Sequence, residues 1–312
     1  MPSPGASSPA PRRCPGSAWE ATDEHPKGGT PMSMQLRVDH TTTYDYDGKA
    51  VASYNQARLT PVTTVDQIVV HSRVEVSPKP WTFEYRDYFG THVTAFEVVD
   101  PHEAMTVSAT STVQTNRTPA PPASLTWEAL AERDVADRWT EFLGTPPMVA
   151  APADFEQRAK QVAADHELPG EAARDLCALV HDEVEFVPGI TQVGGLAATA
   201  WQQRAGVCQD MVHLVVGGLR SVGIPARYVS GYFHPDADPV IGQTVHGYSH
   251  AWVEWWDDGW NGFDPCNDVE PDDRYISVAF GRDYLDVKPI SGIYSGVGTS
   301  RLDADVAIVR LA

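Results

Sequence analysis

The sequence predicts an α+β fold in which an N-terminal antiparallel β-sandwich precedes a unit of helices packed on a second antiparallel sheet. Two observations support this prediction. Residues 34–118 form repeated short stretches in which apolar and polar side chains alternate, as they do in half-buried strands. Beyond a proline-rich segment the apolar spacing becomes that of amphipathic helices, and strand patterns return after residue 225. The chain has 312 residues, 42% of them hydrophobic, which is enough for two domains with substantial cores.

The N-terminal end differs in composition from the rest of the chain. It is rich in Pro, Ser, Gly and Ala, so we expect residues 1–33 to be a disordered tail or to precede a true start at Met32 or Met34. No apolar run approaches the roughly 18 residues that a membrane-spanning helix needs. The remaining segments are expected to be a strand region over 34–118, a linker over 119–126 and the helical unit with its sheet over 127–312.

Charge and cysteine usage restrict the partners and the location. Acidic residues outnumber basic ones by 42 to 23, which gives a net charge of -19. Such a surface repels phosphate backbones and anionic lipids, so we expect neither nucleic acid nor a membrane as a partner. The four cysteines show no CxxC pair, and we expect a protein of the reducing cytoplasm. They are Cys14, Cys177, Cys208 and Cys266.

Three amphipathic helices are expected after the strand region, over residues 125–143, 153–168 and 170–186. Cys177 lies among the apolar positions of the third helix. Because a free cysteine commonly behaves as a small apolar residue, we expect Cys177 to be part of the core.

A fourth helix is expected in the stretch "AGVCQDMVHLVVGGLRSVGIPARYVSGYF", with Cys208 in its first turn. Apolar residues cover nearly the whole of this helix, so it should be central and buried. Gly217 and Gly218 each weaken a helix interior, which indicates that another part of the chain approaches closely there. Gly223 ends the helix, and a strand follows.

The segment "YSHAWVEWWDDGWNGFDP" predicts a β-hairpin whose turn is "DDG". If Trp256 pairs with Trp260, Asp264 lies opposite Trp252 and diagonal to His250. The side chains of His250 and Asp264 then emerge on the same face, close enough to interact. A shift of the register by one residue would separate them.

These three residues suit nucleophilic catalysis. A thiol attacks as the thiolate, which a helix N-terminus and a neighbouring imidazolium both favour. Cys208 has the first of these, His250 could supply the second, and Asp264 could orient the imidazole ring. The backbone N–H of Cys208 is the natural first donor to an oxyanion, and Gln192 and Trp201 are candidates for the second.

The chain also resembles a known family. The runs "GVCQDMVHLVVGGLRSVGIPARYVSGY", "HAWVEWWDDGWNGFDPCND" and "YISVAFGRDYLDVKPISGIYSG" are similar to the bacterial transglutaminase-like proteins of the transglutaminase and papain-like superfamily. The resemblance implies a papain-like core in which the nucleophile helix packs on an antiparallel sheet, over residues 127–312, and an N-terminal β domain over 34–118. It also implies that Cys208 is the nucleophile, His250 the base and acid, and Asp264 the orienting residue.

Some positions depart from the pattern that the resemblance implies. The family commonly has Asp-Pro-Thr-Asn where this chain has "DPCN", so Cys266 replaces a threonine. Cys266 is then either a tolerated small residue or a redox partner of Cys208. His213 falls off the helix face of Cys208 and is expected to be structural. Asp210, in the first helical turn, suits the helix dipole but could also disfavour a thiolate.

The expected function is acyl transfer through a thioester on Cys208, and therefore a cysteine peptidase or amidase acting on a peptide, isopeptide or small amide. Hydrolysis is favoured because the chain shows no EF-hand loop or other calcium motif. The alternative is a protein cross-linking transglutaminase with an amine acceptor. Neither reaction requires a metal or a cofactor, and the oligomeric state stays open.

Two further classes of function compete with this one. A metal site could be formed by Cys208, His246, His250 and Asp264, although no HExxH motif accompanies them. A non-catalytic protein-binding module could instead use a tryptophan-rich surface, unless these aromatic residues only pack within the hairpin. The tryptophans concerned are Trp252, Trp255, Trp256 and Trp260.

Overall fold

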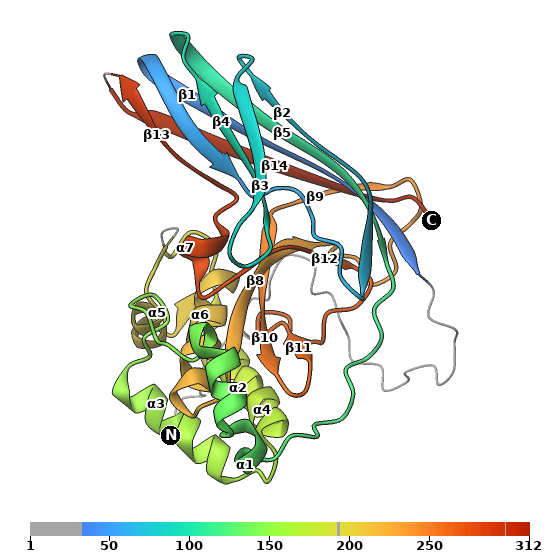
Figure 1. Ribbon diagram of the computed structural model, residues 1–312, viewed down its shortest axis with the longest axis vertical. Helices are drawn as coiled ribbons and strands as arrows, with labels where there is room; N and C mark the ends of the chain where they lie inside the picture. The colour runs from blue at the N-terminus through green and yellow to red at the C-terminus, as the bar shows by residue number, and fades with distance from the viewer. Residues whose placement is uncertain (1–32, 192–193, 297) are drawn as a thin grey trace, which may run out of the picture.

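The computed structural model describes residues 33–191, 194–296 and 298–312, so the expectations for residues 1–32 and for Gln192 lie outside the described residues. It contains one large antiparallel sheet at one end and a helical layer packed on a smaller sheet at the other (Figure 1). The α+β class expected from the sequence is confirmed. Within the described ranges, no helix has both the length and the apolar character to cross a membrane.

The large sheet has eight strands, with the path β2-β5-β1-β14-β9 and three further strands joined to it. They are β1 (Met34–Ala57), β2 (Gln67–Ser77), β3 (Trp81–Arg86), β4 (His92–Val98), β5 (His102–Thr115), β9 (Thr244–Gly247), β13 (Ile290–Gly296) and β14 (Ser300–Arg310). β1 is central because it pairs with β4, β5, β13 and β14. Two strands from the end of the chain therefore complete the sheet that the strand region begins.

The smaller sheet has the order β11-β10-β8-β12 and is antiparallel throughout. Its strands are β8 (Ala226–Phe233), β10 (Ser249–Trp256), β11 (Trp260–Phe263) and β12 (Tyr275–Gly281). A short parallel pair is formed by β6 (Glu185–Phe186) and β7 (Ala205–Gly206). The helices are α1 (Trp127–Leu130), α2 (Arg133–Arg138), the 3-10 turn η1 (Thr140–Phe142), α3 (Ala153–Ala164), α4 (Pro169–Glu183), α5 (Ala197–Gln203), α6 (Cys208–Ser221) and α7 (Tyr284–Val287).

The helix expected over residues 125–143 is instead divided into α1, α2 and η1. The side chain of Thr126 caps α1, and Glu132 has φ -59° and a non-helical ψ of 140°. Such a residue interrupts the helical hydrogen bonds between α1 and α2, and Trp139, with φ -113° and ψ 23°, separates α2 from η1. The expectations for 153–168 and 170–186 are confirmed as α3 and α4, and Cys177 is fully buried in the core.

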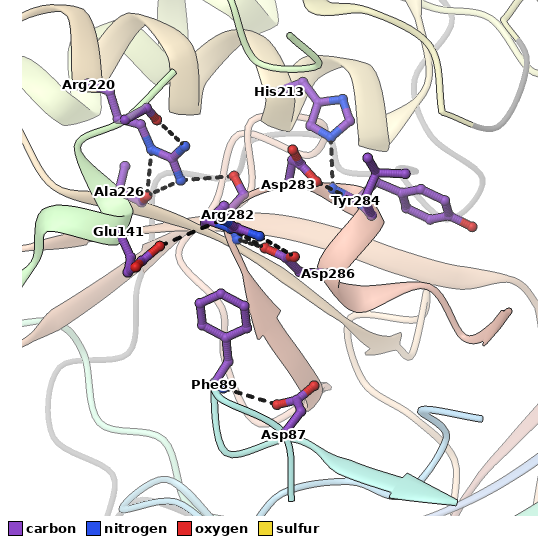
Figure 2. A network of polar contacts seen from close by, with 12 residues as sticks. Asp87, Phe89, Glu141, His213, Arg220, Ala226, Arg282, Asp283, Tyr284 and Asp286 are labelled. Carbon is purple, nitrogen blue, oxygen red and sulfur yellow. Dashed lines mark hydrogen bonds and ion pairs between the residues drawn. The ribbon is translucent and has the colours of Figure 1, made fainter. Parts of the chain in front are cut away.

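α6 is the central helix, and its residues from Gln209 to Arg220 are all buried. Its apolar side chains belong to one core that also contains residues of the large sheet, such as Leu36 and Ile308. Arg220, at the C-terminal end, donates to the carbonyl oxygens of Gly144, Ala226 and Arg282 (Figure 2). The helix is therefore held at its end by side-chain hydrogen bonds as well as along its length by packing.

The two glycines inside α6 are positions of close approach, as expected. A Cβ atom at Gly217 would lie 1.9 Å from the carbonyl oxygen of Val149, which is backbone and cannot rotate away. A Cβ atom at Gly218 would lie 2.7 Å from Leu176. Close packing against α6 therefore requires glycine, despite its poor helix propensity.

We expect Gly217→Ala to lower the free energy of unfolding by about 2 kcal/mol, because the clash outweighs the better helix propensity of alanine. Chemical denaturation followed by circular dichroism measures the change. Gly247→Ala is the matched control, since a Cβ atom there meets no heavy atom within 4 Å. An unchanged or higher stability for Gly217→Ala would contradict this packing.

Candidate active site

Cys208 is the first residue of α6, and its position is set by the residues around it. The carboxylate of Asp210 accepts the backbone N–H of Val207 at 2.9 Å and the hydroxyl of Thr191 at 2.5 Å. Asp210 thus caps the helix that begins at Cys208. A Cβ atom at Gly206 would lie 2.8 Å from the Cβ of Asp210, so this cap requires a glycine in the approach to the helix. Cys208 itself remains partly exposed.

The structure brings Cys208, His250 and Asp264 together. His250 lies near the start of β10, and its Nε2 is 2.6 Å from Oδ2 of Asp264. The same imidazole ring has a side-chain hydrogen bond with Cys208. Because Nε2 is occupied by Asp264, the ring nitrogen that remains for the Cys208 sulfur is Nδ1. One histidine therefore connects a thiol at a helix start with a fully buried carboxylate.

The expected hairpin register is confirmed, because Trp256 pairs with Trp260 and Val253 with Phe263. β11 ends at Phe263, and Asp264 continues in the same direction as the first residue of a turn bridged to Val269. The shared face of His250 and Asp264 follows from this register.

The carboxylate of Asp264 accepts several hydrogen bonds that the sequence did not predict. Oδ2 also accepts from Nδ2 of Asn267 at 2.7 Å and from the hydroxyl of Tyr275 at 2.8 Å. Oδ1 accepts the backbone N–H of Cys266 at 2.9 Å. Asn267 belongs to the "DPCN" motif and could have been considered. Tyr275 lies 11 residues beyond Asp264, on another strand, and no sequence signal pointed to it.

The electrostatics of the pair favour an imidazolium beside a carboxylate. Burial lowers the pKa of His250, but the charge and hydrogen bond of Asp264 outweigh burial and raise it above its ordinary value. Burial raises the pKa of Asp264, but the charge of His250 and three side-chain hydrogen bonds hold it below its ordinary value. The histidine therefore stays protonated over a wider pH range than a free imidazole does.

Other residues that the sequence singled out lie outside this constellation. Trp201 is wrong as an oxyanion donor, because its Nε1 donates to Oδ2 of Asp154 at 2.7 Å. His213 is buried and its Nε2 accepts the backbone N–H of Tyr284, which agrees with a structural role (Figure 2). Cys208 carries a free thiol, so the structure does not join it to Cys266.

The alternative metal site is not assembled. His246 lies on β9 of the large sheet, where its Nδ1 is 3.1 Å from Asp305. Among the residues that the structure describes, no three His, Cys, Asp or Glu side chains are grouped to hold a metal ion.

The tryptophans of the hairpin serve packing. Trp252 and Trp255 are almost completely buried. The rings of Trp256 and Trp260 lie 4.6 Å and 4.9 Å from the ring of Trp139, between their centroids. These aromatic contacts stabilise the hairpin against the segment that contains α2 and η1, and they do not form a free recognition surface.

Comparisons with known proteins identify two matching families along the chain. The family described as the bacterial transglutaminase-like N-terminal region matches residues 36–114, and the transglutaminase-like superfamily matches residues 156–265. An uncharacterized protein of Mycobacterium leprae is 44% identical over 280 residues, covering 89% of this chain and 99% of that protein. An uncharacterized Mycobacterium tuberculosis protein is 32% identical over 294 residues, covering 88% of this chain and 92% of its own.

Two further similarities involve proteins whose names state an enzyme class. A crystal structure from Cytophaga hutchinsonii, titled as a candidate cysteine protease, covers 90% of this chain and 92% of its own, with a TM-score of 0.69. At 20% identity it shows the fold alone. A protein-glutamine gamma-glutamyltransferase of Pseudomonas aeruginosa is 33% identical over 119 residues, which are 35% of this chain and 18% of that enzyme.

The raised pKa of His250 predicts a pH dependence of stability. Above about pH 6.5 the unfolded chain releases the imidazole proton that the folded protein keeps. The stabilisation is therefore complete below that pH and is lost as the pH rises toward the folded pKa. We therefore compare the free energy of unfolding of two variants, Cys208→Ala and Cys208→Ala/His250→Gln. Between about pH 7 and 9 it should fall for Cys208→Ala relative to the double variant, by up to about 1.4 kcal/mol per pH unit.

Urea denaturation at several pH values measures this difference. Both variants carry Cys208→Ala, because a proton that passed from the thiol to His250 within the folded protein would hide the extra proton that His250 keeps on folding. Parallel stability profiles for the two variants would mean that His250 is neutral in the folded protein.

Proposed function

Because the chain belongs to the transglutaminase-like superfamily, we propose that it is a cysteine enzyme that transfers acyl groups through a thioester on Cys208, most readily to water. The observation that carries the proposal is the imidazole of His250, which contacts both the partly exposed thiol and the buried carboxylate of Asp264. A histidine placed between a thiol and a carboxylate can accept a proton, hold it and return it.

At the start of the reaction the proton of the Cys208 thiol has already passed to Nδ1 of His250, which gives a thiolate beside an imidazolium. The sulfur attacks the carbonyl carbon of an amide and forms a tetrahedral intermediate. Its oxyanion accepts the backbone N–H of Cys208, at the positive end of α6. His250 then gives its proton to the leaving nitrogen, the C–N bond breaks, and an amine departs from the thioester.

In the second half, His250 removes a proton from a water molecule that attacks the thioester carbon. The C–S bond breaks, a carboxylic acid is released, and the thiolate again lies beside the imidazolium. Asp264 keeps the ring in one tautomer, since its oxygen contacts Nε2 throughout. A primary amine in place of water would give a new amide by the same steps.

Hydrolysis is favoured because Cys208 is partly exposed, which gives water access to a thioester formed there. The substrate class is then a peptide, an isopeptide or a small amide. Transfer to an amine is the second candidate, supported by the gamma-glutamyltransferase of Pseudomonas aeruginosa that matches 35% of this chain. The cytoplasmic location expected from the cysteine usage stays a prediction, which cell fractionation would test.

The proposal predicts selective alkylation of one cysteine. At about pH 6.5 we expect iodoacetamide to modify Cys208 in the folded protein at least about tenfold faster than in denatured protein, because the imidazolium of His250 stabilises the thiolate. Peptide mass spectrometry locates the modified residue. Cys177 is an internal control, because it is fully buried and should not react while the protein is folded.

The dependence on His250 is tested in the same assay. His250→Ala should slow the alkylation of Cys208 to the rate in denatured protein. His246→Ala is the matched control, since that histidine is exposed and contacts Asp305. A folded protein whose Cys208 reacts no faster than denatured chain would remove the physical basis for catalysis.

The acceptor can be identified with a mixture of short glutamine-containing peptides, incubated with and without an excess of a primary amine. We expect new carboxylic acids as the main products, detected by mass spectrometry, and no products with Cys208→Ala. Amine adducts as the main products would instead assign the protein to the cross-linking transglutaminases.

A further inference from the structure

Tyr275 contacts the same carboxylate oxygen that orients His250. Its hydroxyl is 2.8 Å from Oδ2 of Asp264, and the residue is fully buried. Oδ2 therefore has a fixed direction and shares its charge between an imidazolium and two neutral donors, the Tyr275 hydroxyl and the Asn267 amide. Donors that share one oxygen compete for its electron density, so the Tyr275 hydroxyl weakens the attraction of Asp264 for the His250 proton.

The strand that carries Tyr275 is at the edge of the smaller sheet, where backbone groups lack a neighbouring strand. Gln67, from the N-terminal β region, takes the place of that strand. Its Oε1 accepts the N–H of Ser277 at 2.8 Å, and its Nε2 donates to the carbonyl of Ser277 at 2.8 Å. Gln67 is 1% exposed. The amide therefore pairs with both backbone groups of Ser277, as the backbone of an adjacent strand would.

Arg117 makes a second contact between the β region and β12. Its Nε donates to the carbonyl of Tyr275 at 3.4 Å, and its Nη2 donates to the hydroxyl of Ser277 at 3.0 Å. The backbone N–H of Arg117 also donates to the carboxylate of Asp273 at 2.7 Å, just before the strand. The position of Tyr275 along the sheet thus depends on residues that precede the helical unit in the sequence.

We propose that Tyr275 is a positioning residue for Asp264, and that the N-terminal β region completes the active site by holding the Tyr275 strand through Gln67 and Arg117. The inference rests on the proposed function for its catalytic meaning. It gives the β region a role in the reaction itself, because the strand held by Gln67 and Arg117 keeps the Tyr275 hydroxyl on Oδ2 and so limits how strongly Asp264 holds the His250 proton.

The other titratable groups around the pair come from four elements. They are the thiol of Cys208 on α6, the thiol of Cys177 on α4, Asp268 in the turn after β11, and Asp272 and Arg274 at the start of β12. Replacing the Tyr275 hydroxyl removes none of these groups, and Arg274, which does interact with Tyr275, stays paired with Asp272. A changed titration of His250 in Tyr275→Phe therefore reports on the hydroxyl.

The test is a pH titration of the His250 ring by NMR in protein labelled with 15N-histidine. The Cys208→Ala protein serves as the parent, and the His250 signals are assigned by their loss in Cys208→Ala/His250→Gln. Adding Tyr275→Phe should raise the midpoint of the His250 titration by about half a unit to one unit, because Asp264 loses a competing donor. An unchanged or lower midpoint would overturn the role of Tyr275.

Tyr232→Phe is the matched control. Tyr232 is also buried and its hydroxyl lies 2.9 Å from Nδ1 of His40, away from Asp264. We expect no shift of His250 in this variant. A shift as large as that of Tyr275→Phe would mean that any lost hydroxyl in this core has the effect, which would also overturn the proposal.

The role of the β region is tested by Gln67→Met, which keeps the length of the side chain but cannot pair with Ser277. We expect a shift in the same direction, and no further shift when Gln67→Met is combined with Tyr275→Phe, because both act through one contact. Gln56→Met is the control, since Gln56 pairs with Ala95 and Ser291 on the large sheet. Additive shifts, or no shift from Gln67→Met, would overturn the coupling.

Arg117→Met provides a second route if Gln67→Met does not fold, as circular dichroism would show. It should shift His250 in the same direction, and an unchanged midpoint would count against the coupling. The parent protein lacks the nucleophile, so the titration needs no activity. A protein without thioester chemistry would contradict the proposed function, whereas an unchanged His250 titration would contradict the role of Tyr275. The two failures can therefore be told apart.

Discussion

A fully buried carboxylate, Asp264, is the constraint on which the arrangement of the site depends. An unpaired charge in a protein interior is strongly unfavourable, so every oxygen of this group must find donors. It finds them in His250, Asn267, Tyr275 and the backbone of Cys266. These donors come from β10, from β12 and from the turn after β11, so the carboxylate requires three pieces of the smaller sheet to be in register. The same bonds fix the imidazole that contacts Cys208.

The helix that begins at Cys208 meets a different requirement. α6 is buried along nearly its whole length, so the unpaired backbone N–H groups at its start and the unpaired carbonyl groups at its end need hydrogen-bond partners. Asp210 accepts the N–H of Val207 at the start. At the other end the carbonyls of Leu219 and Arg220 accept backbone N–H groups of the residues that follow the helix, and the Arg220 side chain donates to three carbonyl oxygens outside it. Cys208, at the start of this helix, remains partly exposed. Rigid burial of the helix and access to its first residue are therefore compatible.

The N-terminal β region and the helical unit are physically one structure. β13 and β14, from the end of the chain, pair with β1, and the core around α6 includes Leu36, Val38 and Val113 from the large sheet. Gln67 and Arg117 add hydrogen bonds to the edge of the smaller sheet. Removal of the β region would expose this core and leave that edge unpaired. The tertiary contacts thus make the helical unit dependent on segments from both ends of the chain.

The sequence by itself determined the features that depend on neighbours along the chain. The period of the apolar residues predicted most strands and helices, the glycines of α6 predicted close packing, and the turn "DDG" set the register that places His250 and Asp264 on one face. The apolar period did not predict that the helix expected over residues 125–143 is interrupted at Glu132. Only the tertiary structure decided that Cys208 contacts His250 and that Tyr275 donates to Asp264. It also decided that Gln67 pairs with Ser277, and that the indole of Trp201 donates to Asp154 and not to the site. Gln67 and Ser277 are 210 residues apart, and no local periodicity carries information across that separation. Contacts of this kind arise from the packing of completed elements, and they decide which of the candidate residues can act together.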